Sequence, residues 1–193
     1  NEYYGIPYSV DMGASVYAPQ GMHATETTPL PLMHNHDIIA QPANLYNLTA
    51  SYANYIDNFL KERSNDENNK PWCIYMAFNH VHLPQFHNPY YNGKSRRGEF
   101  GDATMELDDA IGNIMKSINQ YNFDEDTVIF YTSDNGGPLN HDIPGNNGLF
   151  KGSKGSTYEG GVRVPGFIRW KNTIKNNIIT QEMATTMDFF TTM

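Results

Sequence analysis

The sequence is poor in cysteine, in basic residues and in long apolar runs, and each shortage excludes a class of protein. Only one of its 193 residues, Cys73, is a cysteine, so the chain cannot form an internal disulfide framework. Acidic residues outnumber basic ones by 21 to 13, and the net charge of −8 excludes the basic surface of a nucleic-acid-binding protein. The apolar runs are far too short to span a membrane, and no signal peptide is found, the first residue being Asn1.

An apolar run at positions 128–131, Val-Ile-Phe-Tyr, predicts a buried strand. It leads to Asp134 and Asn135, followed by two glycines that permit a sharp break in the backbone. A carboxylate and an amide oxygen that leave a strand together suit a hard cation such as Ca²⁺ or Mg²⁺. The alternative is a tight hairpin, because Asn-Gly is a strong turn signal. Residues 139–147 do not resemble a returning strand, which weakens that alternative.

Lys154 lies among small residues, in the run Gly-Ser-Lys-Gly-Ser. A single lysine in such surroundings can bring its ammonium group close to a bound anion. The tripeptide Glu159-Gly160-Gly161 that follows predicts a turn that packs this loop, and we assign it no catalytic role.

A second apolar run, at positions 71–79, predicts a strand buried on both faces, in which Cys73 is buried and inert. His80 and His82 follow it directly. Open α/β sheets place their functional side chains just past the carboxyl ends of strands. Two histidines two residues apart are either a pair of metal ligands or loop residues with satisfied hydrogen bonds.

Two segments have the apolar periodicity of amphipathic helices, residues 49–63 and 98–121. Thr49 or Ser51 is available to cap the first helix and Asp102 to cap the second. The acidic residues of the second helix are interpreted as a solvated face rather than as paired catalytic carboxylates; they are Glu106, Asp108 and Asp109. The alternation of strands and helices predicts an α/β fold with a mainly parallel sheet.

Two further patterns concern the first fifty residues. His34, His36 and Asp37 are close together, but no cysteine or second histidine pair accompanies them, so a solvated loop or hairpin is favoured over a zinc site. Asn47-Leu48-Thr49 is an N-glycosylation sequon, which makes Asn47 a candidate glycosylation site.

The sequence resembles the second half of the catalytic domain of the formylglycine-dependent sulfatases, and most closely their arylsulfatase A-like branch. The run Ser-Asp-Asn-Gly-Gly, followed by GLFKGSKGSTYEGGVRVP, carries this resemblance. It implies an alkaline-phosphatase-like α/β fold and a sulfuric ester hydrolase. Asp134 and Asn135 would bind the divalent metal, usually Ca²⁺ with Mg²⁺ possible, and Lys154 would contact the sulfate.

The same resemblance implies three further roles. The strand followed by His-x-Pro matches the pattern whose histidine faces the leaving-group oxygen, which is His82 and not His80. Gly-Ile-Pro-Tyr-Ser matches a loop whose serine, here Ser9, lies near the substrate sulfate. Asp134 would also help to activate the nucleophile.

The sequence departs from the family at the nucleophile. The formylglycine is made from the cysteine of a C-x-P-x-R motif, and Cys73 is followed by Ile-Tyr-Met-Ala instead. We therefore expect residues 1–193 to be a partial sulfatase catalytic domain that lacks the nucleophile-bearing N-terminal part and the C-terminal remainder, and to be inactive alone. Two protein ligands are also too few for a tight Ca²⁺ site.

The resemblance also indicates partners and a location. The substrate would be a sulfated small molecule, lipid or glycan, with no nucleic acid and no membrane span in this segment, and the protein would be lysosomal or secreted. The oligomeric state is not indicated. Two alternatives stay open: a phosphoesterase or phosphonate hydrolase of the same superfamily, and a non-catalytic relative that binds sulfated glycans.

Overall fold

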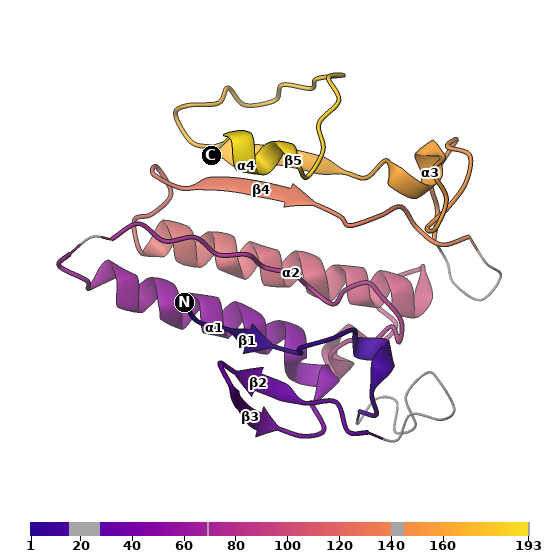
Figure 1. Cartoon of the computed structure of the whole chain (residues 1–193), viewed down its shortest axis with the longest axis horizontal. Coiled ribbons are helices and arrows are strands. Elements are labelled where there is room, and N and C mark those ends of the chain that lie inside the picture. The colour runs from indigo at the N-terminus through magenta and orange to yellow at the C-terminus, as the bar shows by residue number, and fades with distance from the viewer. Residues whose placement is uncertain (16–27, 69, 140–144, 193) are drawn as a thin grey trace. The chain divides into compact units, whose positions relative to one another are not determined.

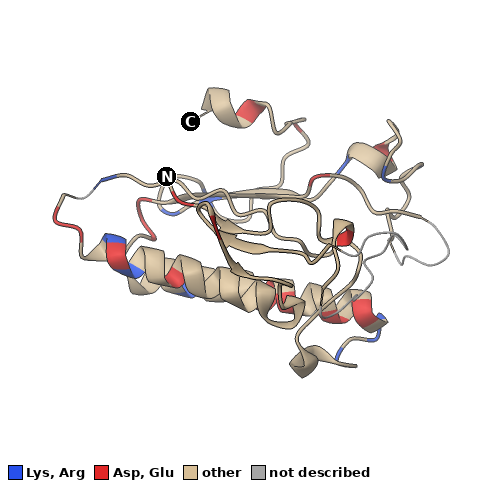
Figure 2. Ribbon diagram, turned by 60° about the horizontal axis from the view of Figure 1, so that its bottom comes forward, with Lys and Arg blue, Asp and Glu red and all other residues tan. Residues whose placement is uncertain are grey.

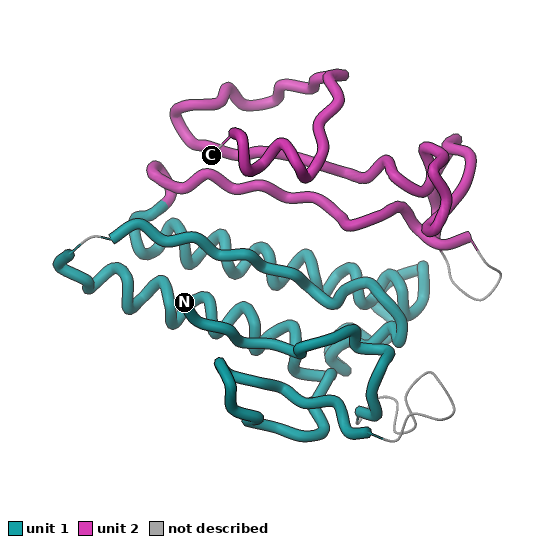
Figure 3. Tube along the Cα trace, in the orientation of Figure 1, with its two compact units in different colours: residues 1–123 teal, residues 124–193 magenta. Residues whose placement is uncertain are grey.

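The computed structural model describes residues 1–15, 28–68, 70–139 and 145–192. The chain forms two compact units, Asn1–Phe123 and Asp124–Met193, which are coloured separately in Figure 3. Each unit is considered by itself. No helix in the described ranges is both long enough and apolar enough to cross a bilayer.

The first unit contains a small antiparallel sheet of three strands: β1 (Tyr4–Gly5), β2 (Leu32–His34) and β3 (Asp37–Ala40). β2 and β3 form a hairpin that turns at Asn35, whose φ of 55° lies in the left-handed region. His34 and His36 therefore belong to a hairpin, as predicted. His34 Nε2 lies 3.1 Å from the hydroxyl oxygen of Tyr55, and no cluster of three or more His, Cys, Asp or Glu ligands occurs in the described residues.

Two long helices, α1 (Leu48–Ser64) and α2 (Gly98–Gln120), pack against each other and confirm both helix predictions. They are the central ribbons of this unit in Figure 1. Short 3-10 turns stand elsewhere in the unit: η1 (Val10–Met12), η2 (Leu45–Asn47) and η3 (Pro89–Tyr91).

The predicted helix caps are wrong, because α1 begins at Leu48 and α2 at Gly98, upstream of the residues expected to cap them. Asn47 and Arg97 occupy the N-cap positions. Asp102 lies in the second turn of α2, where it is buried and accepts hydrogen bonds from the backbone N–H groups of Gly93 (2.8 Å) and Ser95 (2.7 Å). These bonds lower the pKa of Asp102, that of Ser95 having the largest effect, so Asp102 anchors the turn before the helix.

Residues 71–79 do not form the strand predicted for them, since they pair with no other strand in the described part of the chain. Their burial alternates: Trp72, Ile74, Met76 and Phe78 are half-buried and the residues between them are exposed. The inward side chains pack on unit 1, as Trp72 does against Phe59 and Phe123, whose ring centroids are 6.2 and 5.5 Å away. Only one face is covered, so Cys73 is exposed rather than buried.

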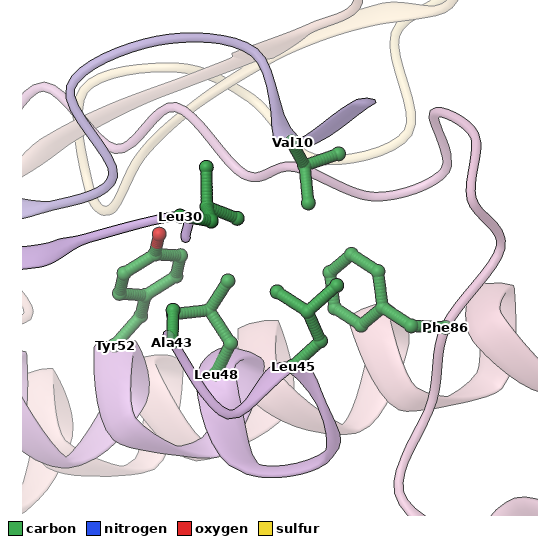
Figure 4. Close-up of a cluster of buried hydrophobic side chains, with 7 residues drawn as sticks. All are labelled: Val10, Leu30, Ala43, Leu45, Leu48, Tyr52 and Phe86. Carbon is green, nitrogen blue, oxygen red and sulfur yellow. The ribbon is translucent and has the colours of Figure 1, made fainter. Parts of the chain in front are cut away.

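The core of unit 1 is assembled mainly from loops and from the start of α1. Figure 4 shows its seven buried side chains facing one another; they are Val10, Leu30, Ala43, Leu45, Leu48, Tyr52 and Phe86. Burying a side chain of this size stabilises the fold by about 1.5–3 kcal/mol. The core therefore ties together segments that are far apart in the sequence.

The second unit is built on an antiparallel strand pair, β4 (Val128–Thr132) and β5 (Gly166–Trp170), with two short helices, α3 (Glu159–Val162) and α4 (Asp188–Thr192). Asp124 fixes the pair through ion pairs with Arg169 (2.6 Å) and Lys171 (3.0 Å). All pairs among the described strands are antiparallel, and only the isolated bridge between Ala14 and Pro29 is parallel. The mainly parallel sheet predicted from the sequence has no counterpart among these pairs.

Basic residues are scattered along the described parts of both units. Figure 2 shows the lysines and arginines as short, scattered blue segments, and neither long helix carries a row of them.

Candidate functional site

Asp134, Asn135 and Lys154 lie on one long connection in unit 2. We call the described residues between β4 and β5, 133–139 and 145–165, the glycine loop. The partners Thr132 and Gly166 close its two ends. The strand that returns beside β4 is β5, which begins only at Gly166, so the tight hairpin at Asn135-Gly136 is excluded.

Backbone hydrogen bonds fold the glycine loop onto itself and bring its two functional parts together. The N–H of Gly136 donates to the carbonyl oxygen of Gly161 (2.9 Å). The N–H of Lys154 donates to the carbonyl oxygen of Gly137 (3.2 Å), two residues after Asn135. The predicted anion-binding lysine is thus attached directly to the turn that carries the predicted metal ligands.

Glycine is required where these backbone segments meet. A Cβ atom on Gly136 would collide with the carbonyl oxygen of Gly160, and one on Gly160 would collide with that of Gly152. A Cβ on Gly161 would collide with the carbonyl oxygen of Ser156. Gly160 and Gly161 are buried, which confirms that Glu159-Gly160-Gly161 is a turn that packs the loop.

Asn147 is a positioning residue that the sequence reasoning missed. Its Nδ2 donates to the carbonyl oxygens of Gly137 (2.9 Å) and Gly152 (3.1 Å), and its Oδ1 accepts from the N–H of Gly137 (2.8 Å). An amide can donate and accept at once, so this one side chain joins both halves of the loop. In the sequence, Asn147 is simply a polar residue in a glycine-rich run, and this pattern does not indicate its role.

The oxygen atoms of Asp134 and Asn135 fit a hard cation. Asn135 Nδ2 donates to the carbonyl oxygen of Gly136 (3.0 Å), which leaves its Oδ1 for a ligand. Asp134 is exposed, and one of its carboxylate oxygens, Oδ1, accepts from the N–H of Asn135 (2.9 Å). One carboxylate and one amide oxygen are the ligand types that Ca²⁺ and Mg²⁺ prefer, although a full Ca²⁺ shell has about six to eight oxygens.

Lys154 has an exposed side chain, and its ammonium group forms no ion pair with any residue of the described ranges. The nearby Lys151 differs, because its Nζ lies 4.2 Å from the centroid of the Tyr158 ring. The charge of Lys154 is therefore available to an anion, while that of Lys151 is engaged by an aromatic face.

His82 belongs to unit 1 and has an exposed side chain. Its Nδ1 lies 2.9 Å from the carbonyl oxygen of Leu83. A carbonyl can only accept, so Nδ1 carries the proton of this bond and Nε2 is left for a substrate. This arrangement suits an imidazole that exchanges a proton through Nε2.

His80 has a different environment from His82. Its side chain is 1% exposed, and Nε2 lies 3.1 Å from Oε2 of Glu106 and 2.8 Å from Oγ1 of Thr49. Protein groups thus engage His80 at Nε2, which fits the loop histidine better than the metal ligand, and Nδ1 has no hydrogen-bond partner among the described residues. The interpretation of Glu106 as part of a solvated face is wrong, because Glu106 is 3% exposed; Asp108 and Asp109 are exposed as expected.

Ser9 lies in unit 1, in the N-cap position of η1, and its hydroxyl donates to Asp11 Oδ1. Its neighbour Val10 belongs to the same core cluster as Phe86, four residues after His82 (Figure 4). The segments that carry Ser9 and His82 are thus anchored in one core. The five predicted site residues form two groups, Ser9 with His82 in unit 1 and Asp134 with Asn135 and Lys154 in unit 2.

Comparisons with known proteins identify the family of the chain. The profile of the sulfatase family matches residues 12–193. Arylsulfatase A of Bos taurus is 33% identical over 202 residues, which cover 100% of this chain and 39% of the relative. Steryl-sulfatase of Rattus norvegicus is 34% identical over 168 residues, which cover 84% of this chain and 28% of the relative. The chain thus spans about two fifths of the length of arylsulfatase A.

Solved structures show the same fold. The crystal structure of Ps i-CgsB has a TM-score of 0.71 at 27% identity, over 89% of this chain and 40% of that one. PsFucS1 sulfatase from Pseudoalteromonas sp. has a TM-score of 0.70 at 21% identity, over 90% of this chain and 38% of that one, and supports the fold alone. The alkaline-phosphatase-like α/β fold predicted from the sequence is confirmed, and the chain belongs to the sulfatase family.

Proposed function

We propose that this chain is part of an arylsulfatase-like sulfuric ester hydrolase that cleaves a sulfate monoester with the help of a divalent cation. The observation that carries the proposal is the bond between the N–H of Lys154 and the carbonyl oxygen of Gly137, which joins a free cationic side chain to the turn of Asp134 and Asn135. A bound cation and a positive side chain can both stabilise the negative charge of a transferring sulfate group.

The proposal gives each of these residues a defined role. Asp134 and Asn135 hold the cation, Ca²⁺ or Mg²⁺, which polarises the sulfate oxygens when it is bound. Lys154 stabilises the negative charge on the transferring group, and Ser9 lies near the substrate sulfate. His82 gives a proton from Nε2 to the oxygen that leaves as an alcohol or phenol.

The nucleophile lies outside residues 1–193 in this proposal, as a formylglycine made from a cysteine elsewhere in the full protein. Cys73 is exposed but lacks the C-x-P-x-R surroundings of that cysteine. Residues 1–193 are then one part of a catalytic domain, and Asp134 helps to activate a nucleophile contributed by another part. The isolated segment is expected to show no turnover of an aryl sulfate.

The substrate class is a sulfated small molecule, lipid or glycan. Support for a glycan comes from a solved neighbour, Ps i-CgsB in complex with k-i-k-neocarrahexaose, which has a TM-score of 0.68 at 27% identity. Support for a smaller ester comes from the arylsulfatase and steryl-sulfatase relatives.

We also propose that the protein passes through the secretory pathway, to a lysosome or the cell exterior, and carries a glycan on Asn47. Asn47 is exposed, and its Oδ1 accepts from Asn88 Nδ2 (3.2 Å), which leaves its own Nδ2 for the sugar. Treatment of the secreted protein with a peptide N-glycosidase should lower its mass, and Asn47→Gln should abolish the part of that shift due to this site. An unchanged mass shift in the variant would contradict the proposal.

The test of the proposed reaction uses the full-length protein and 4-nitrophenyl sulfate. Lys154→Ala should lower kcat by about 10²–10³-fold, as loss of one charge-stabilising group does in other enzymes. Lys151→Ala is the matched control and should keep the wild-type rate, because its ammonium faces Tyr158. Faster cleavage of 4-nitrophenyl phosphate than of the sulfate would point instead to a phosphoesterase, and equal effects of the two lysine variants would contradict the role of Lys154.

A further inference from the structure

The segment that carries His82 is held at both ends by one buried carboxylate. We call residues 80–88 the histidine loop. Oε2 of Glu106 lies 3.1 Å from His80 Nε2 and accepts a hydrogen bond from the backbone N–H of Asn88 (3.2 Å). His80 opens the loop and Asn88 ends it, so a single oxygen atom on α2 fixes the distance between them.

His80 is held from two further directions. The hydroxyl of Thr49, on α1, lies 2.8 Å from Nε2. The ring of Phe86, which is fully buried, lies 4.5 Å from the imidazole ring at an interplanar angle of 34°. Contacts from α1, α2 and the core of unit 1 therefore determine the position of His80.

Stability alone does not account for a buried pair of this kind. The side chains of His80 and Glu106 are 1% and 4% exposed, and removing two such groups from water costs about as much as their attraction returns. Apolar side chains of the same volume would fill the space equally well. What the pair adds is a fixed position for the imidazole, since His80 Nε2 is hydrogen-bonded to groups on both long helices.

His82 depends on that geometry because it has little support of its own. Its side chain is exposed, and its one hydrogen bond among the described residues is to the carbonyl oxygen of Leu83 in the same loop. Its position relative to the rest of unit 1 is therefore set by the backbone of the histidine loop. A misplacement of about 1 Å can cost an enzyme on the order of 10² in rate.

We infer that Glu106 and His80 are positioning residues that hold His82 where it protonates the leaving group. This inference rests on the proposed role of His82 and adds two residues that touch neither substrate nor cation. Removal of the Glu106 carboxylate should therefore slow the reaction only because it displaces His82.

The first test measures structure in the full-length protein and needs no activity. Glu106→Ala should increase amide hydrogen exchange within residues 81–88, whereas Glu106→Gln keeps an acceptor oxygen and should preserve most of the protection. Asp108→Ala, an exposed acid on the same helix, is the matched control and should leave the exchange unchanged. Unchanged exchange in Glu106→Ala would overturn the inference, whatever the enzyme cleaves.

The second test compares two leaving groups. Phenyl sulfate needs a proton on its departing oxygen far more than 4-nitrophenyl sulfate does. Glu106→Ala should therefore lower kcat for phenyl sulfate on the order of 10²-fold and for 4-nitrophenyl sulfate much less, with KM nearly unchanged. Equal losses with both esters would overturn the inference, because a general structural defect does not distinguish leaving groups.

A double-mutant cycle separates positioning from independent effects. The pair Glu106→Ala and His82→Ala should be no slower than His82→Ala alone, since Glu106 acts through His82. Multiplied losses would overturn the inference. If the wild-type protein cleaves neither ester, the proposed function is wrong, and the exchange measurement alone then decides whether Glu106 fixes the loop.

Discussion

The two loops that carry the candidate chemistry are built in opposite ways. The glycine loop of unit 2 is held mainly by backbone atoms that approach one another where side chains are absent, as at Gly136 and Gly160. The histidine loop of unit 1 is held by side chains, chiefly the buried pair of His80 and Glu106. Adding side-chain atoms should therefore disrupt the glycine loop, whereas removing side-chain atoms should disrupt the histidine loop.

The largest effect is expected from adding one methyl group to the glycine loop. Gly136→Ala would press a Cβ against the carbonyl oxygen of Gly160, so we expect a loss of stability of about 3 kcal/mol or more and loss of activity. Urea unfolding measures this. Gly112→Ala in α2 is the control, because no atom lies within 4 Å of its Cβ position. It should stabilise the protein by about 0.5–1 kcal/mol. Equal behaviour of the two variants would contradict backbone packing as the basis of the glycine loop.

A smaller effect is expected from removing the one side chain that spans the glycine loop. Asn147→Ala deletes bonds to Gly137 and Gly152, and leaving those groups unsatisfied should cost about 1–3 kcal/mol. The unfolding midpoint in urea measures it. Asn146→Ala removes only a local bond to the N–H of Gly148 and should cost less. A larger loss in Asn146→Ala would show that the loop is not joined through Asn147.

In the histidine loop the corresponding change is Thr49→Val, which keeps the shape of the side chain and removes the hydroxyl beside His80. We expect a loss of about 0.5–1.5 kcal/mol, typical of one hydrogen bond. Thr49→Ser keeps the hydroxyl and should retain that part of the stability. Thermal unfolding of both variants provides the measurement, and a Thr49→Ser protein less stable than Thr49→Val would refute the importance of this bond.

The smallest effect concerns the strand pair that closes the glycine loop, and it depends on pH. The hydrogen bond from Lys171, followed by that from Arg169, lowers the pKa of Asp124 below its ordinary value of 3.8. A lowered carboxylate pKa stabilises the folded state above the ordinary pKa, and this stabilisation is lost as the pH falls through the folded value. Asp124→Asn should therefore be less stable than wild type at pH 7, and the difference should shrink below pH 3.8. The exposed Asp126→Asn should show no such trend. A difference that is constant with pH would contradict the ion pair.

The contrast between the loops also explains how much could be predicted from the sequence. The glycine loop is a single stretch of the sequence. Its candidate metal ligands, its lysine and its packing turn could therefore be recognised from the order of residues alone. The histidine loop depends on residues 49, 80, 88 and 106, whose meeting is a property of the tertiary fold. Helix periodicity predicts α2 correctly but places Glu106 on the exposed face. Nothing in the sequence near Glu106 indicates that its carboxylate has a buried partner, His80.

Burial was also misjudged for the apolar run 71–79. Its composition is that of a strand covered on both faces, yet burial needs neighbours that composition cannot supply. In unit 1 the inward side chains pack against the core and the opposite face, including Cys73, is exposed. Both long helices, in contrast, were predicted to within a few residues, because periodicity is a local property of the sequence.

The central claim is that Asp134 and Asn135 hold a divalent cation that the reaction requires. The most direct measurement is hydrolysis of 4-nitrophenyl sulfate by the full-length protein after treatment with a chelator and again after Ca²⁺ is restored. The wild-type protein should lose its activity and regain it, whereas Asp134→Ala should regain none at the same Ca²⁺ concentration. Wild-type turnover that survives complete removal of divalent metal, or full recovery by Asp134→Ala, would contradict the claim.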